Sequence, residues 1–364
     1  MRETVSHREA RLLLHNKFVV VLGDSIQRSV YKDLVMLLQK DSCLTLKQLK
    51  NKGEMSFELD SLVEGGCLGQ MNNGTEYREV RQYQSDHHLV RFYFVTRIFS
   101  RYMQSIMEDF RRGLKPDVLI VNSCIWDISR YNPNWTADYK ENLKRFFDEL
   151  KMVLPEESLV IWNLTMPLGK RIKGGFLVPE IVHKVPQLRY DVIEANFYGW
   201  TLADAYEMDV LDLHFQFRFS LQHRTTDGIH WNAIAHRRIT ALLLQHIAQA
   251  WGVTLAAEDG HQTAAADDAY REILTDSLSF QENPEPLAEN FRPAVRSRWP
   301  RPQRKQRHNP YEQPRYGFDY MRPPYSEPYE DHRHEFVMRT RHGRPHYAPY
   351  THRRPAHPPF HGYY

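Results

Sequence analysis

One short stretch near the N-terminus constrains the fold more than any other part of this chain. Phe18 to Leu22 is a run of five apolar residues, three of them valine. A strand that is apolar on both faces is typical of the centre of a parallel sheet covered by helices. Gly23-Asp24-Ser25 interrupts the run, and Ile26 to Gln39 then shows the apolar spacing of a helix. The sequence therefore predicts a strand, a turn and a helix in direct succession.

Apolar runs and helical patterns continue to alternate as far as residue 250. Ser6 and Glu9 form a capping box that predicts a short helix before Lys17. Further strands are expected at Leu44–Leu49, Leu89–Val95, Val118–Val121, Leu159–Trp162 and Val210–Leu213. Further helices are expected at Ile98–Phe110, Asp138–Val153, Val185–Ala205 and Ile234–Trp251. This alternation predicts a three-layer α/β/α fold with a doubly wound, mainly parallel sheet, whose ligands bind at the carboxyl ends of the strands.

Charge and composition divide the 364 residues into three zones. Residues 1–250 carry 32 Lys+Arg and 30 Asp+Glu, residues 251–291 carry 1 and 9, and residues 292–364 carry 15 and 6. The last zone has no Leu or Ile and only two Val, and a segment so poor in aliphatic side chains cannot offset the entropy cost of folding. We therefore expect one folded domain over 1–250, an acidic linker over 251–291, and a disordered basic tail over 292–364. Residues 264–278 of the linker have the apolar spacing of a short helix.

Several protein classes are excluded by simple observations. No apolar run is long enough to cross a bilayer, and the first 17 residues lack the apolar core of a signal peptide. Cys43, Cys67 and Cys124 are odd in number and widely spaced, which argues against a disulfide framework or a zinc site. The sequence therefore predicts an intracellular protein of the cytoplasm, the nucleus or both, without a metal or another cofactor.

Ser25 is the first residue that suggests chemistry. It follows the first predicted strand, so its hydroxyl is expected to face the binding crevice. N–H groups at the start of the following helix can stabilise an oxyanion there. Asp24 or Ser25 is equally well explained as a helix cap, because both residue types are favoured in that position.

Asp227 and His230 lie three positions apart, just before the last predicted helix. In a turn entering a helix, this spacing lets the carboxylate accept a hydrogen bond from Nδ1 of the imidazole. Nε2 is then free to take a proton from a serine. An ordinary solvated loop explains the pair as well, since the chain contains 19 histidines.

Two candidate oxyanion donors follow other predicted strands. Asn122 comes directly after Val118–Val121, and its side-chain amide can donate to a developing negative charge. Gly53 follows Leu44–Leu49 and offers a backbone N–H in the same role. The alternatives are that Asn122 is a turn residue and that glycine occupies position 53 because the backbone there needs a positive φ angle.

In their order and spacing these residues resemble the SGNH or GDSL hydrolase superfamily. Within it, the chain resembles the PC-esterase family over residues 15–250, through the segments VVVLGDSIQRSVYKDL, LKNKGEMSFELD, VNSCIWDISRY and DGIHWN. The resemblance implies acyl-ester chemistry, with Ser25 as nucleophile and with His230 and Asp227 completing a triad. It also implies an oxyanion hole formed by the N–H groups of Ser25 and Gly53 and the amide of Asn122.

The segment around Asn122 departs from the corresponding superfamily pattern, which is G-x-N-D. Ile120 stands in place of its glycine and Ser123 in place of its aspartate, so the support of Asn122 is expected to differ. Trp126 and Asp127 are candidates to replace that support or to contact the substrate. No substrate is named by the pattern.

Two function classes follow from the sequence. The first is a serine esterase that acts on an acyl ester of unidentified class. The second is an inactive hydrolase-like adaptor, whose tail of 14 Arg, 9 Tyr and 8 His binds RNA or a protein partner. A solvated basic tail that makes only non-specific contacts is an equally good explanation of residues 292–364.

Overall fold

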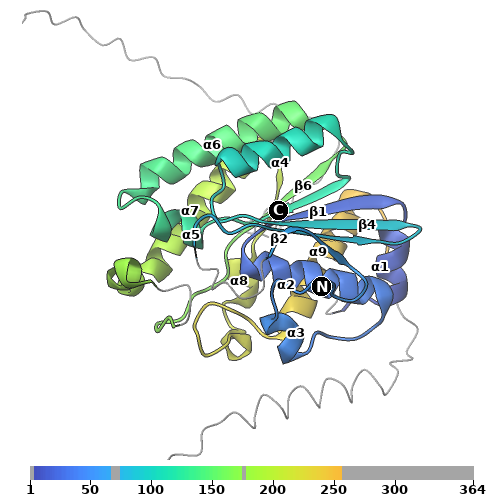
Figure 1. The fold of residues 1–364 in the computed structure, drawn as a ribbon, viewed down its shortest axis with the longest axis horizontal. Helices are drawn as coiled ribbons and strands as arrows, with labels where there is room; N and C mark the ends of the chain where they lie inside the picture. The colour runs from blue at the N-terminus through green and yellow to red at the C-terminus, as the bar shows by residue number, and fades with distance from the viewer. Residues whose placement is uncertain (1–3, 67–73, 174–177, 256–364) are drawn as a thin grey trace, which may run out of the picture. The chain divides into compact units, whose positions relative to one another are not determined.

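The computed structural model describes residues 4–66, 74–173 and 178–255 (Figure 1). The predicted linker beyond residue 255, its helix and the basic tail lie outside these ranges, as does Cys67. Among the described helices, none combines the length and the apolar character that a bilayer crossing requires.

The described strands form one seven-stranded sheet with the order β2-β3-β4-β1-β5-β6-β7. Neighbours from β4 to β7 run parallel, whereas β2 and β3 are antiparallel additions at one edge. β1 is therefore central, as its apolar sequence predicts. The strands are β1 Lys17–Gly23, β2 Ser61–Gly65, β3 Glu79–Gln84, β4 His88–Phe94, β5 Val118–Val121, β6 Leu159–Asn163 and β7 Asp209–Leu211.

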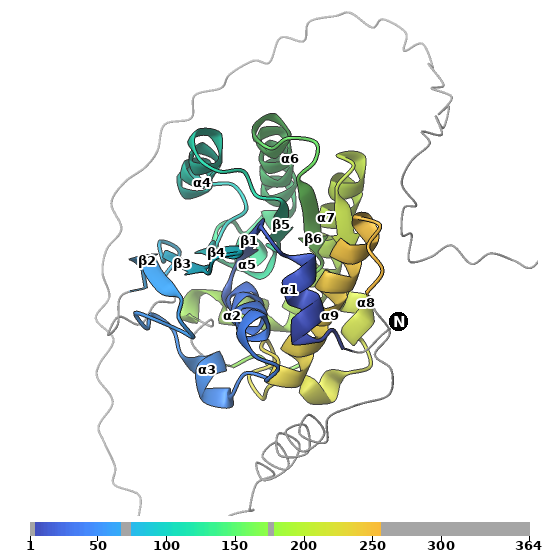
Figure 2. The same ribbon diagram turned by 90° about the vertical axis from the view of Figure 1, so that its right-hand side faces the viewer.

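Helices cover both faces of the sheet, which confirms the predicted three-layer, mainly parallel fold (Figure 2). The α-helices are α1 His7–Leu13, α2 Ser25–Gln39, α3 Leu46–Lys50, α4 Arg101–Arg112, α5 Ile125–Arg130, α6 Trp135–Val153, α7 Val185–Ala205, α8 Leu213–Phe217 and α9 Ala233–Ala250. Two 3₁₀ helices, η1 Pro179–Lys184 and η2 Leu221–His223, complete the described elements.

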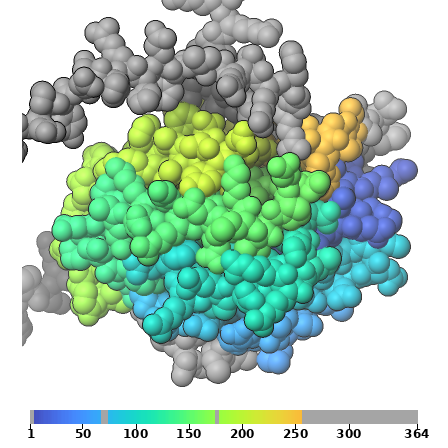
Figure 3. All heavy atoms as spheres, turned by 90° about the horizontal axis from the view of Figure 1, so that it is seen from above, coloured from blue at the N-terminus to red at the C-terminus, as the bar shows by residue number. Residues whose placement is uncertain are grey.

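Successive side chains of β1 point to opposite faces of the sheet and pack into two separate apolar cores. Val19 and Val21 pack with buried residues of α1, α2 and α9, whereas Val20 and Leu22 pack with those of α4, α6 and α7. Figure 3 shows the second of these faces from outside, where the teal and green residues of α4 and α6 lie side by side. Burial of both strand faces explains why β1 is apolar throughout.

The segment between α2 and β4 differs from the sequence prediction. Leu44–Leu49 is not a strand: α3 occupies Leu46–Lys50, because the side chains of Thr45 and Gln48 form a reciprocal capping box. β2 and β3 were not predicted, since their sequences mix charged with apolar residues. At the other edge, β7 ends at Leu211 and Leu213 already begins α8, whose first turn is capped by Asp212.

Candidate active site

The turn from β1 to α2 is built by Gly23 and Asp24. Gly23 has φ 153°, and a Cβ there would lie 2.3 Å from Cγ of Gln27, so only glycine fits. Asp24 caps α2, accepting a 2.9 Å hydrogen bond from the N–H of Ile26. Burial raises the pKa of Asp24. Asp24 is therefore the cap, and the Ser25 hydroxyl is left for another partner.

That partner is His230. Ser25 Oγ lies 2.8 Å from Nε2 of His230, and Nδ1 of the same ring lies 2.7 Å from Oδ2 of Asp227. The serine and histidine side chains are half-buried, so the pair is open to solvent on one side. The structure thus brings together the three residues singled out from the sequence as nucleophile, base and orienting acid.

Asp227 is held by its own turn. Its Oδ1 accepts hydrogen bonds from Thr225 Oγ1 at 2.7 Å and from the N–H groups of Ile229 and His230 at 2.9 and 3.0 Å. Burial by itself raises the pKa of Asp227, but hydrogen bonds and positive charge from His230, with the two N–H groups, outweigh it and hold the pKa well below its usual value.

An ionised Asp227 decides the tautomer of His230. A carboxylate only accepts hydrogen bonds, so Nδ1 of the neutral ring carries the proton and Nε2 is the acceptor. The Ser25 hydroxyl therefore donates to Nε2. This is the arrangement in which a serine proton can be removed by the ring.

Asn122 lies beside this group but its amide points into the protein. Nδ2 donates to the carbonyl of Asn163 at 2.8 Å and to Thr165 Oγ1 at 3.0 Å, both just beyond or at the end of β6. These two acceptors hold the Asn122 side chain in its present orientation. They were missed from the sequence, although Thr165 follows a predicted strand at the same edge of the sheet.

Trp126 and Asp127 are both buried in α5. The Asp127 carboxylate accepts hydrogen bonds from Ser123 Oγ and from the N–H of Ile98 at 3.1 Å, and burial raises the pKa of Asp127 to about 7. Trp126 packs edge-on against Phe94 and under the guanidinium of Arg130. Asp127 therefore positions Ser123, the residue after Asn122, and does not contact the Asn122 side chain in the described contacts.

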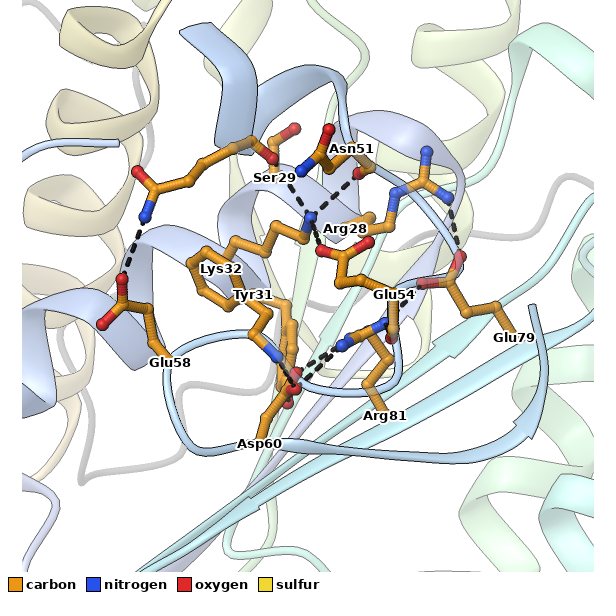
Figure 4. Close-up of polar contacts among 12 residues, drawn as sticks. Arg28, Ser29, Tyr31, Lys32, Asn51, Glu54, Glu58, Asp60, Glu79 and Arg81 are labelled. Carbon is orange, nitrogen blue, oxygen red and sulfur yellow. Dashed lines mark hydrogen bonds and ion pairs between the residues drawn. The ribbon is translucent and has the colours of Figure 1, made fainter. Parts of the chain in front are cut away.

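Gly53 is buried with φ 70°, in a loop that is anchored by charged side chains. Lys32, from the second turn of α2 after Ser25, donates to the carbonyls of Gln48 and Asn51 and to the carboxylate of Glu54 (Figure 4). The Lys32 side chain is 1% exposed. No described contact joins Gly53 to Ser25, so its role as an oxyanion donor stays a prediction.

β3 holds the same loop from the other side. Arg81 donates to the carbonyl of Glu54 at 2.8 Å and makes a two-pronged ion pair with Asp60 at 2.8 Å (Figure 4). Asp60 also accepts from Tyr31 of α2. The only sequence signal for this network is the presence of Arg28 and Lys32 among the mainly apolar residues of α2.

A narrow recess adjoins the Ser25 turn. It is bounded by Asp24 and Ile26 on one side and by Asn122 and Thr165 on the other, with an apolar wall that includes Trp231. Within the described ranges, no cluster of three His, Cys, Asp or Glu side chains is arranged to hold a metal ion.

Comparison with known proteins finds close sequence relatives. The chain is 58% identical over 249 residues to PC-esterase domain-containing protein 1A of Homo sapiens, a match that covers 68% of this chain and 55% of that protein. It is 57% identical over 253 residues to the Mus musculus 1A protein, with 69% and 56% covered, and 54% identical over 249 residues to the human 1B protein, with 68% and 58% covered. The chain spans little more than half the length of these curated relatives. No protein-family model matches it.

The solved structures that comparison finds are far more distant in sequence. The acetylxylan esterase Axe2 of Geobacillus stearothermophilus is 14% identical with a TM-score of 0.37, covering 70% of this chain and all of that one. A lipase/acylhydrolase of Enterococcus faecalis is 13% identical with a TM-score of 0.37, covering 66% and 99%. The sequence relatives are the informative matches, and their identity of more than half shows that this chain belongs to the family of PC-esterase domain-containing proteins.

Proposed function

We propose that the described domain is a serine esterase of the SGNH type, which acts on an acyl ester through Ser25, His230 and Asp227. The observation that carries the proposal is the 2.8 Å contact between Ser25 Oγ and His230 Nε2, in a ring oriented by Asp227. Membership in a family named for an esterase domain agrees with it.

The reaction begins at Ser25. Nε2 of His230 removes the hydroxyl proton as Oγ attacks the carbonyl carbon of the ester, and the positive charge that develops on the ring is stabilised by Asp227. His230 then gives the proton to the departing alcohol oxygen, which leaves an acyl group on Ser25. Water activated by the same ring hydrolyses this intermediate and regenerates the serine.

The oxyanion of the tetrahedral intermediate needs donors near Ser25. The N–H of Ser25 at the start of α2 is one, and the partial positive charge of that helix end adds to it. The N–H of Gly53 and the amide of Asn122 are the other proposed donors. For Asn122 to take part, one amide hydrogen has to leave its present acceptor, Thr165 Oγ1 or the Asn163 carbonyl.

A fluorophosphonate probe tests the nucleophile directly, because it forms a covalent bond only with an activated serine. We expect labelling of the full chain, loss of labelling in Ser25→Ala, and unchanged labelling in Ser105→Ala, which removes an exposed serine on α4. Labelling that persists in Ser25→Ala, or a folded wild-type protein that is never labelled, overturns the proposal.

A second candidate function is a catalytically inactive adaptor, with partners bound by residues 292–364. The internal hydrogen bonds of the Asn122 amide favour it, because they direct a proposed oxyanion donor away from Ser25. A panel of acetylated sugars, lipid esters and acyl-protein esters, with Ser25→Ala as the blank, separates the two. Turnover of any member above the blank rejects the inactive adaptor. Crosslinking of the chain to RNA, with and without residues 292–364, tests separately whether the tail binds RNA.

A further inference from the structure

A second concave region, of about 500 Å³, opens beside the proposed active site. Its wall combines residues from three parts of the chain: Lys170 after β6, Arg189 on α7, and Arg218 and Arg224 around η2. His214 of α8 also lines it. Four permanent cations and no carboxylate therefore face one cavity, which we call the basic pocket.

The cations of the basic pocket are not neutralised by neighbouring acids. In the ranges that the structure describes, no carboxylate lies within 4.0 Å of Lys170, Arg189, Arg218 or Arg224. Their contacts are uncharged: Arg224 donates to the carbonyl of Pro167 at 3.1 Å, and Arg218 stacks on the ring of Phe215. Burial lowers the pKa of Arg224. Like charges gathered in this way raise the local concentration of anions.

The basic pocket is joined to the active site by shared walls. Leu168 lines both the basic pocket and the recess beside Ser25. Nδ1 of His214 lies 2.9 Å from the carbonyl of Thr165, whose hydroxyl accepts from Asn122. The basic pocket and the recess therefore share part of one wall.

Backbone hydrogen bonds fix the pocket against the loop that carries the base. The N–H of Gly169 donates to the carbonyl of Gly228 at 2.8 Å, and the N–H of Lys173 donates to the carbonyl of Asp227 at 2.8 Å. Gly228 has φ 82°, and a Cβ there would lie 2.1 Å from the carbonyl oxygen of Arg171, so the two loops are in close contact. Arg224 lies three residues before Asp227 on the same loop. A ligand in the basic pocket is thereby held at a set position relative to His230.

We infer that the ester substrate carries an anionic group, such as a phosphate, sulfate or carboxylate, which the basic pocket binds while the ester carbonyl lies at Ser25. The inference rests on the proposed esterase function and adds the substrate class. The anion belongs to the alcohol part of the ester, because the recess beside Ser25 is lined mostly by apolar residues and offers no cationic side chain, so that a negative charge there is costly. Arginine forks suit the planar and tetrahedral oxygen arrays of these groups.

Matched pairs of esters test the preference. We expect kcat/KM to be at least about ten times higher for 1-acetylglycerol 3-phosphate than for 1-acetylglycerol, and higher for 4-acetoxybenzoate than for its methyl ester, chiefly through KM. Replacing Lys170, Arg189 and Arg218 together by Gln is expected to reduce both ratios toward one. Arg101→Gln, an exposed cation on α4, is the matched control and is expected to leave the ratios unchanged.

A binding experiment tests the anion site separately from turnover. Ser25→Ala is titrated with inorganic pyrophosphate by calorimetry, with and without the three Gln replacements. Saturable binding that the replacements weaken at least about tenfold supports the pocket, even when no ester is turned over and the esterase proposal fails. Turnover without preference for the anionic ester, or pyrophosphate binding that is indifferent to the replacements, overturns the inference and leaves the esterase proposal standing.

Discussion

Ser25 Oγ and His230 Nε2 lie 2.8 Å apart, although 205 positions separate the two residues in the sequence. The serine is positioned by the turn between β1 and α2, and the histidine by the turn that precedes α9. α2 and α9 pack against each other on the same face of the sheet, which brings the two turns together. The pair is therefore a product of helix packing.

Asp227→Asn tests the orientation of His230. An amide in place of the carboxylate can donate to Nδ1, which favours the tautomer with the proton on Nε2 and prevents that atom from accepting the serine proton. We expect kcat to fall by about 10⁴-fold with little change in KM. Steady-state kinetics on an activated ester, beside circular dichroism spectra to verify folding, measure the effect. A fall of less than tenfold contradicts the assigned role.

Asn122 and Thr165 form a matched pair of variants. Asn122→Ala removes the proposed oxyanion donor and is expected to lower kcat by about 10²-fold or more. Thr165→Val removes an acceptor of the amide, frees an N–H for the oxyanion, and is expected to leave kcat equal or higher. Equal losses in both variants, or no loss in Asn122→Ala, show that Asn122 supports the fold and not the reaction.

Lys32→Met tests the anchoring of the loop that carries Gly53. Lys32 is buried and holds two carbonyls and Glu54, so its removal leaves acceptors unpaired, and we expect a loss of about 3 kcal/mol in the free energy of unfolding. Below the unfolding transition, kcat is expected to fall while labelling of Ser25 by the fluorophosphonate persists.

Lys40→Met is the control for that change. Lys40 directly follows the last residue of α2. It pairs with Glu58 of the same loop at 3.0 Å, but its side chain is 52% exposed. Exposed ion pairs contribute about 0–1 kcal/mol, so the control is expected to keep its kcat and most of its stability. Similar kcat losses in both variants show that any disturbance of the loop acts alike, and the specific role of Lys32 is then rejected.

Asp127→Asn tests a pH effect on stability. In the folded protein burial raises the pKa of Asp127 to about 7, whereas an unfolded aspartate loses its proton near pH 3.9. Between these values the folded state binds more protons, so this group makes the free energy of unfolding decrease as pH rises, by on the order of 1 kcal/mol per pH unit. Asparagine does not titrate, and the difference between wild type and variant should change with pH.

Urea unfolding at pH 5, 6 and 7.5 measures this difference. We expect the variant to gain stability relative to the wild type as the pH rises through this range. A difference that stays constant across the three pH values means that Asp127 does not keep its proton in the folded protein.

Acyl-chain length tests the recess beside Ser25. Its volume of about 10 Å³ is roughly the space that one water molecule needs, and most of its lining residues are apolar. We expect 4-nitrophenyl acetate to be hydrolysed with a kcat/KM at least about tenfold above that of the octanoate. A preference for the longer chain means that the acyl group does not enter this recess.

Much of the architecture was predictable, because it depends on local patterns. The apolar run of β1, the capping box of Ser6 and Glu9, and the helical spacing of α2, α6, α7 and α9 each report burial or hydrogen bonding within a short segment. The segment from residue 44 to residue 84 was not predictable in this way. There the Thr45–Gln48 capping box outweighed apolar content, and the charged strand β3 is stabilised by partners on α2 and in the loop before it.

For the site, the sequence determined the residue types and their order: a serine after the first strand, an asparagine after an interior strand, and an aspartate three positions before a histidine. Only the tertiary structure decided how they are used. Asp24 and not Ser25 caps α2, the Asn122 amide turns toward Thr165, and cations from three separated segments line one pocket. The Asn122 amide finds its acceptors 41 and 43 positions away, and the Ser25 hydroxyl finds His230 205 positions away. A distant partner leaves no mark on the local pattern of a sequence.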